Sequence, residues 1–504
     1  MLTEKDQKRI LEQGRSLELI FRQEEQLKKG IQPLNRLEIA VLEDGINALS
    51  DQEQKAALKA FQQQDGTQTW LKFVPASGAA SRMFSDLFAY WDQKKNTHFN
   101  LESYLKNQEN KDFKRFSTQL KKLPFYTHVY AYIIQHPEAF QWDEHTFFEA
   151  FMEALLNEKH LDYSHLPKGL IPFFTDETGN AYTPFEAHLQ EAIALAPLEQ
   201  KIDLHFTIDK QHRPAFEALE EDFLSSQQTE LKVSYSYQHP LTDTPVLDSQ
   251  EEWVRNDEGH LLFRKGGHGA LLENLNQIEN DFVWLKNIDN IQWGVQNQQT
   301  TTWMQILGGI TLTLQKQLFT HLRALEEQRA NLDFEPVVAF IQTYFDKTFQ
   351  LTPHNKLPHE KLIDYLHRPL RVCGMIKNEG KAGGGPFWMH SKRGRHLQIV
   401  EGVELNLETP EHQKLMAKST HFNPVLMVCA ITDRKGVKFP LHQFCDDQRY
   451  MIAHKTLGAK KIKALEWPGL WNGGMAHWNT YFVEVPKETF HPVKKVTDLI
   501  NDSN

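Results

Sequence analysis

Cysteine is scarce in this sequence, with only Cys373, Cys429 and Cys445 among 504 residues. Their spacing matches no metal-binding motif, and three thiols cannot build a disulfide framework. Such scarcity is typical of proteins that work in a reducing compartment. We therefore expect a cytoplasmic protein without structural disulfides.

Long hydrophobic runs and an excess of positive charge are also lacking. No apolar run approaches the ~20 residues of a membrane-spanning helix, and the opening residues MLTEKDQKRILEQ have no apolar core of a signal peptide. The formal net charge is −10, which disfavours attraction to nucleic acid or to an anionic membrane surface. We expect neither as a partner, and the sequence gives no indication of the oligomeric state.

What the chain does contain is enough apolar material for a large core. Hydrophobic residues make up 40% of the sequence and aromatic residues 11%, and strands alternate with helices between residues 204 and 237. That order predicts an α/β fold with a mixed, mostly parallel sheet. We expect an N-terminal helical arm (1–66), a core (67–400) carrying a helical insertion at about 85–162, and a C-terminal α/β part (401–504) that completes the core.

The most informative stretch is WLKFVPASGAASRMF, from Trp70 to Phe84. An apolar strand leads into a run of small residues and then into Arg82, at what we predict to be the start of a helix. Backbone N–H groups in such a loop can approach a phosphate closely, and Arg82 can add a charged contact. The alternative is a turn that serves only close packing of a strand on a helix. The predicted nucleotide-binding residues here are Ala76, Ser77, Gly78, Ala79, Ala80 and Ser81.

Three further segments carry candidate site residues. LPKGLIPFF contains Lys168, although Pro-Lys pairs are common in surface turns. FRKGGHGALLENL places Gly267, His268 and Gly269 before an amphipathic helix, where a purely structural loop is the usual interpretation. DFVWLKNIDNI is a short strand that ends in Asp289, a position suited to a Mg²⁺ ligand, although Asn/Asp turns often simply terminate a strand.

The order of these segments resembles that of the UDP-sugar pyrophosphorylases. ASGAASRM resembles the AAGxGTRM signature of sugar nucleotidyltransferases, with Ala80 in place of the usual glycine. PKGLIP matches PKxLxP, GGHG resembles PGHG, and NIDN resembles NxDN. From its PASGAASRM, GGHGAL and KNIDN strings, the chain is identified as a member of the DUF4301 family.

This resemblance implies a Rossmann-like GT-A nucleotidyltransferase core and a function. The implied enzyme transfers a nucleotidyl group from an NTP, with UTP favoured, to a sugar 1-phosphate and releases pyrophosphate. Arg82 and Lys168 would be catalytic residues that bind phosphates, the GGHG loop would lie against the base, and Asp289 would hold Mg²⁺. The NTP and the sugar phosphate are thus the expected partners.

Two other functions stay open at this stage. A GT-A glycosyltransferase would bind a nucleotide sugar, but its usual DxD is absent, and Arg82 and Lys168 speak against it. A non-catalytic nucleotide-binding protein is favoured by Ala80 and by the lack of a second acidic metal ligand. The glycine-rich stretch 380–388 predicts either a loop that faces the substrate or a β-hairpin.

The resemblance also makes a geometric prediction. Open α/β sheets bind ligands at the carboxyl ends of their strands. We therefore expect Lys168 and Asp289 to lie near Gly78 at one edge of the sheet, with His268 lining the same pocket.

Overall fold

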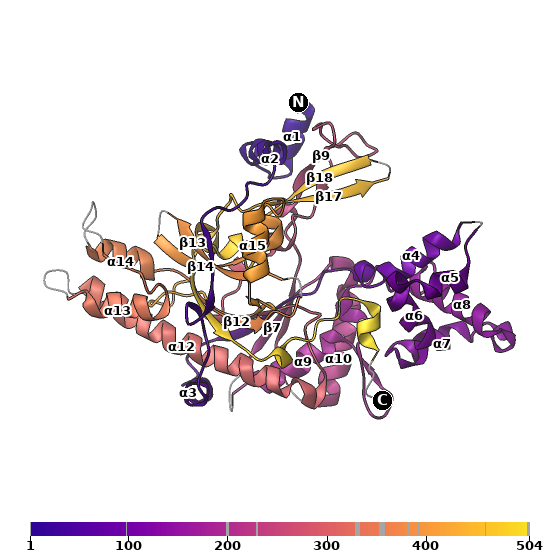
Figure 1. Ribbon diagram of the computed structural model, residues 1–504, viewed down its shortest axis with the longest axis horizontal. Coiled ribbons are helices and arrows are strands. Elements are labelled where there is room, and N and C mark those ends of the chain that lie inside the picture. Colours follow the sequence, from indigo (N-terminus) through magenta and orange to yellow (C-terminus); the bar gives the residue numbers. More distant parts are fainter. Residues whose placement is uncertain are drawn as a thin grey trace.

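A mixed β-sheet forms the centre of the computed structural model, which describes residues 2–500 apart from 97, 198–200, 228–229, 328–332, 352–357, 381–382, 392–393 and 459. The α/β prediction is therefore confirmed (Figure 1). Within the described residues the sheet has ten strands, in the order β2 (Val41–Leu42), β3 (Gly45–Asn47), β19 (Asn479–Glu484), β12 (Leu370–Lys377), β16 (Leu426–Ala430), β11 (Phe282–Lys286), β4 (Trp70–Pro75), β7 (Asp203–Thr207) and β8 (Val233–Ser236), with β15 (His421–Phe422) beside β12.

Most neighbouring strands run parallel. Along this order the exceptions are the two antiparallel pairings that β16 makes with β11 and β12. In the parallel pair of β4 and β11, Trp70 lies opposite Phe282 and Phe73 opposite Leu285. The carboxyl ends of these two strands therefore meet at one edge of the sheet, and so do the loops that follow them.

Helices cover both faces of this sheet. On one face, α12 (Gln298–Glu327) crosses α3 (Asp51–Gln62) so closely that a Cβ on Gly309 would come within 1.8 Å of the Ala57 carbonyl oxygen. The short helix α11 (Leu271–Asn276) packs on the opposite face through Leu275, which is fully buried with Phe73. Two more helices, α9 (Pro184–Leu195) and α10 (Arg213–Gln227), bury Phe185 and Phe216 against the strands β4 and β7.

The N-terminal residues are not wholly helical, so the prediction of a helical arm over 1–66 is wrong in part. Helices α1 (Glu4–Glu12) and α2 (Leu17–Lys29) are present, but β1 (Leu37–Ile39) pairs with β13 (Gly385–Ser391), and β3 joins the central sheet beside β19. These strands are two or three residues long, and partners distant in the sequence supply their hydrogen bonds. Helical periodicity in the surrounding sequence therefore could not reveal them.

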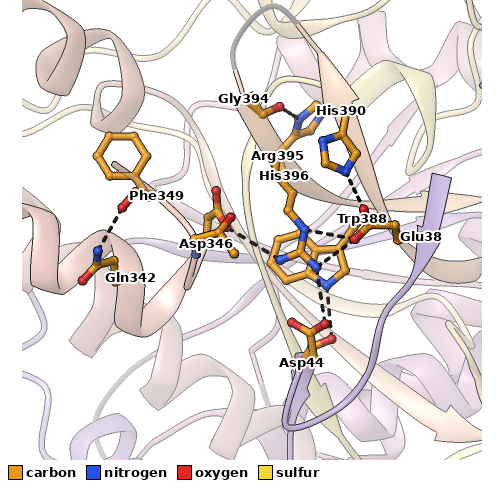
Figure 2. A network of polar contacts seen from close by, with 11 residues as sticks. Glu38, Asp44, Gln342, Asp346, Phe349, Trp388, His390, Gly394, Arg395 and His396 are labelled. Atoms are coloured by element: carbon orange, nitrogen blue, oxygen red, sulfur yellow. Dashed lines mark hydrogen bonds and ion pairs between the residues drawn. The ribbon is translucent and has the colours of Figure 1, made fainter. Parts of the chain in front are cut away.

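A charged network fastens these strands to the rest of the fold (Figure 2). The guanidinium of Arg395 lies 3.8 Å from the centre of the Trp388 ring and forms ion pairs with Glu38 at 3.1 Å and with Asp44 at 3.3 Å. A third carboxylate, Asp346, lies 3.7 Å away. Because three acidic side chains surround it, we interpret Arg395 as a structural anchor of the N-terminal strands.

Residues 381–382 of the glycine-rich stretch 380–388 lie outside the described residues, and residues 385–388 lie in the first strand of a hairpin. Its strands are β13 (Gly385–Ser391) and β14 (Gly394–Val400), which pair antiparallel. Strand β14 ends at Val400, and a 3₁₀ turn at Gly402–Glu404 follows it. The smaller sheets contain β10 (Phe263–Arg264), β9 (Thr244–Asp248), β18 (Lys460–Glu466) and β17 (Met451–Leu457), and, separately, β5 (Phe174–Thr175) and β6 (Ala181–Tyr182).

The segment after the first loop forms a separate group of helices at the right of Figure 1. Tyr90 and Phe113 stack at its centre, with ring centroids 4.3 Å apart. Its helices are α4 (Ser85–Lys94), α5 (Leu101–Lys106), α6 (Lys111–Thr118), α7 (Tyr126–Ile133) and α8 (Glu144–Leu156), and the remaining helices of the core are α13 (Glu335–Tyr344), α14 (Pro358–Leu366) and α15 (Pro410–Lys418). Of the helices described, none has the length and apolar character needed to span a membrane.

Candidate functional site

The loop after β4 presents unused backbone donors at the carboxyl edge of the sheet. The N–H of Ala76 still donates to Thr207 O on β7, at 2.8 Å. The N–H groups of Ser77, Gly78 and Ala79 donate to no residue in the described part of the chain. A Cβ placed on Gly78 would meet nothing within 4 Å, so the surface there is open. This loop can therefore accept an anion on its backbone.

The helix expected after this loop begins later than predicted. Ala80–Arg82 forms a 3₁₀ turn, and α4 begins only at Ser85. Arg82 is thus not at the start of a crossover helix but in that turn, where it is exposed and forms no ion pair with a described residue. The methyl group of Ala80 is fully buried against the helices that follow, so it does not narrow the open side of the loop.

Lys168 lies against the same loop, although ninety residues separate it from Gly78. The segment from Leu166 pairs antiparallel with the loop, with Ala80 N donating to Leu166 O at 2.9 Å and Lys168 N donating to Gly78 O at 3.2 Å. The chain therefore returns from the helical group to the point where it left the sheet. Lys168 therefore lies beside Gly78, as the sequence predicts.

Asp289 joins this pair through its side chain. It follows β11, and its Oδ2 accepts hydrogen bonds from Lys168 Nζ at 2.8 Å and from Lys494 Nζ at 2.9 Å. Burial by itself would raise the pKa of Asp289, but the two ammonium groups hold it below its usual value. The cluster of two lysines and one carboxylate thus keeps one formal positive charge beside the open loop.

Lys494 is the residue that sequence reasoning missed. Residues 490–494 contain neither a glycine-rich loop nor a strand end, so no local pattern marked it. The structure brings it in through the backbone, because Val493 N donates to Asp289 O at 3.1 Å and Pro492 forms a bridge with Asn290. Its side chain is 60% exposed, against 14% for Lys168, so Lys494 can reach a ligand in solution.

One carboxylate at this site, that of Asp289, is available to coordinate a magnesium ion. Asp289 Oδ1 accepts no hydrogen bond from the residues that the structure describes, and they contain no group of three His, Cys, Asp or Glu side chains suited to a metal. Mg²⁺ needs few protein carboxylates when substrate phosphates and water complete its shell. Asp289 therefore fits a Mg²⁺ ion that arrives with a phosphate ligand, and does not fit a metal held by protein alone.

The GGHG loop packs on a partner that the sequence did not indicate, the loop after β18. A Cβ on Gly269 would lie 2.2 Å from Pro468 O, and one on Gly267 would lie 2.7 Å from a carboxylate oxygen of Glu466. His268 stacks on Trp471 at 4.3 Å. This close packing is sufficient to explain why glycine occupies positions 267 and 269. The role of His268 in a nucleotide site stays a prediction.

The protonation of His268 is defined by its surroundings. Burial lowers the pKa of His268 to about 4, so the ring is neutral at pH 7. Its Nδ1 accepts the backbone N–H of Leu470 at 3.2 Å. In a neutral imidazole the other nitrogen then carries the proton, so Nε2–H is a hydrogen-bond donor.

A buried ionic cluster lies beneath the candidate site. The Glu191 carboxylate on α9 lies 2.6 Å from Lys72 Nζ of β4 and 2.5 Å from Lys286 Nζ of β11, and all three side chains are fully buried. Burial by itself raises the pKa of Glu191, and the two lysines more than reverse that effect. Because β4 and β11 carry the 76–82 loop and Asp289, Glu191 helps to hold the two halves of the site together.

Comparison with solved structures finds matches at low identity and with TM-scores below 0.5. A mutant of UDP-glucose pyrophosphorylase from Leishmania major, in complex with UDP-glucose, is 12% identical with a TM-score of 0.45, over 99% of this chain and 79% of that one. UDP-N-acetylglucosamine pyrophosphorylase from Trypanosoma brucei, in complex with an inhibitor, is 10% identical with a TM-score of 0.48, over 95% and 74%.

Sequence comparison is more definite about the family. Among curated proteins, no sequence matches this chain. The model of the family described as "Domain of unknown function (DUF4301)" matches residues 3–504, so the chain belongs to the DUF4301 family.

Proposed function

We propose that this protein is a nucleotidyltransferase that transfers a nucleotidyl group from an NTP, with UTP favoured, to a sugar 1-phosphate. The observation that carries the proposal is the cluster of Lys168, Asp289 and Lys494 beside the open loop at Gly78. It combines backbone donors, a net positive charge and one carboxylate. Such a site suits a triphosphate, which brings several negative charges and its own metal ion.

In the proposed reaction, an oxygen of the sugar 1-phosphate attacks the α-phosphorus of the NTP. A new bond forms between them, and the bond from the α-phosphorus to the oxygen that bridges to the β-phosphorus breaks. Pyrophosphate leaves with that electron pair. This displacement needs in-line positioning and neutralisation of charge, and little covalent chemistry from the protein.

The residues of the site divide these tasks. Lys168 and Lys494 neutralise charge on the phosphate oxygens, and Arg82, which is exposed, can add a bidentate contact. The backbone N–H groups at Gly78 hold a further phosphate oxygen. Asp289 holds both lysines in place and would be the protein ligand of Mg²⁺, which supplies additional charge neutralisation when bound.

The preference for UTP rests on the resemblance of the GGHG loop to the base-binding loop of UDP-sugar pyrophosphorylases. His268 supports it chemically, since its neutral ring has an Nε2–H group that can donate to a carbonyl of the base.

The test measures pyrophosphate released by the purified protein from UTP, ATP, GTP or CTP with a pool of sugar 1-phosphates and Mg²⁺. We expect release with UTP that depends on the sugar phosphate. Thermal stabilisation by nucleotides without pyrophosphate release would instead indicate a binding protein. Release of UDP from a nucleotide sugar would indicate a glycosyltransferase, and either result would overturn the proposal.

A further inference from the structure

The group of helices formed by residues 85–162, here called the helical insertion, holds the C-terminal segment formed by residues 490–500. In Figure 1 the yellow end of the chain lies between the core and the purple helices. Val496 and Leu499 are buried in the same apolar cluster as Ala80 and Met83, and Val496 N donates to Met83 O at 3.0 Å. The segment that carries Lys494 is thus packed between the loop of residues 76–82 and the helical insertion.

Charged contacts reinforce this packing. Lys495 Nζ lies 2.6 Å from a carboxylate oxygen of Asp112 on α6 and 3.3 Å from one of Asp86 on α4. At the end of the segment, Arg115 donates to Ile500 O at 2.9 Å. Both carboxylates therefore belong to the insertion, and the lysine they hold is the immediate neighbour of Lys494.

The backbone at this point explains why the two lysines face different partners. Lys495 is extended, with φ −120° and ψ 155°, and successive side chains of an extended chain point to opposite sides. Lys494 accordingly reaches Asp289 while Lys495 reaches the insertion. Asp498 fixes the same turn, since its Oδ2 accepts both Lys494 N and Lys495 N at 2.8 Å.

We propose that Lys495 is a positioning residue of the phosphate site, and that the helical insertion serves this site by holding the C-terminal segment so that Lys494 reaches Asp289. This inference rests on the proposed function, which identifies the natural ligand as a nucleoside triphosphate. It assigns a task to the insertion, which forms no ion pair with Lys168 or Lys494 among the residues that the structure describes.

The ion pairs of Lys495 are suited to a test because they are partly exposed. The side chain of Lys495 is 47% exposed, and those of Asp86 and Asp112 are 36% and 25% exposed. Partly exposed pairs contribute little to global stability. Replacing Lys495 should therefore leave the protein folded but make the position of the Lys494 side chain less well defined. A loss of ligand binding without a loss of stability then identifies Lys495 as a positioning residue and not a structural one.

The experiment measures binding of tripolyphosphate to the full-length protein by calorimetry. Lys495→Met should weaken binding about 3–10-fold, with Lys495→Arg close to wild type, because one ordered cationic contact loses its support. The matched control is Lys487→Met, since Lys487 precedes the same segment but pairs with Glu379 outside the insertion. That variant should bind like wild type.

A double-mutant cycle shows whether Lys495 acts through Lys494. In a Lys494→Ala background, Lys495→Met should have no further effect on tripolyphosphate binding. An equal loss in both backgrounds, or unchanged binding in Lys495→Met, would overturn the inference. Absence of tripolyphosphate binding in wild type would overturn both proposals, whereas binding without pyrophosphate release from UTP would overturn the proposed function alone.

Discussion

Replacing Glu191 by Gln tests how the fold holds the two halves of the site together. Glu191 is the shared anion of Lys72 and Lys286, at 2.6 and 2.5 Å, and none of the three side chains is exposed. Gln keeps the shape and one oxygen acceptor but removes the negative charge. Two buried ammonium groups are then left without a counter-charge.

The expected loss follows from this burial. Removing one partner of a buried ion pair typically costs about 3–5 kcal/mol of unfolding free energy, and we expect a destabilisation of that order at pH 7. Burial already lowers the pKa of Lys72 to about 7 and lowers that of Lys286. The Glu191 charge raises both pKa values in wild type. Without it the folded variant binds fewer protons than folded wild type, so the stability difference between the two should shrink as the pH rises.

The assay is thermal and urea unfolding of wild type and Glu191→Gln at pH 7 and pH 9.5. The variant should unfold at a clearly lower midpoint at pH 7 and recover part of the difference at pH 9.5. A matched control is Glu230→Gln, because Glu230 pairs with Lys201 at the surface with 88% of its side chain exposed. If the two variants behave alike at pH 7, or if Glu191→Gln is worse at pH 9.5, the buried cluster does not have the role described.

Four further variants address the site and its supports. Asp289→Asn should fold normally but lose Mg²⁺-dependent nucleotide binding by calorimetry; retention of that binding would exclude Asp289 as the metal ligand. Gly269→Ala should lower the melting temperature, since its Cβ would lie 2.2 Å from Pro468 O, whereas Gly78→Ala should not, since its Cβ would meet nothing. Burial lowers the pKa of His205 to about 4, so the unfolded chain binds more protons between that pH and 6.5, and this side chain alone should account for roughly 3 kcal/mol of the stability that wild type loses on acidification through this window. The His205→Gln variant should lack this loss, and identical pH profiles of unfolding would contradict it.

The central strands and the order of the loops could be predicted from the sequence because their signals are local. Trp70–Pro75 and Phe282–Lys286 are mainly apolar, with one lysine in each, and turn-forming residues follow both. Parallel pairing of neighbouring strands then places Asp289 on the same edge as Gly78. Local patterns and one topological rule were sufficient for that part of the site.

The remainder depends on partners distant in the sequence. The short strand Leu37–Ile39 exists because Phe387–Met389 offers its hydrogen bonds, and Lys494 reaches Asp289 because Val493 bonds to its backbone. Likewise, the glycines at 267 and 269 face residues 466–468 and need no ligand to explain them. None of these pairings leaves a periodicity or a motif in either segment alone.

The most direct test of the central claim is calorimetric binding of UTP with Mg²⁺ to wild type, Lys168→Ala and Lys494→Ala, with Lys487→Ala as the control. The account predicts that wild type binds UTP and that each of the two site variants loses roughly 1–3 kcal/mol of binding free energy, the range for one charge-assisted contact. Melting temperatures should stay within a few degrees of wild type, and Lys487→Ala should bind normally. Unchanged affinity in Lys168→Ala and Lys494→Ala, or no binding of UTP by wild type, would contradict the claim that this cluster is a nucleotide phosphate site.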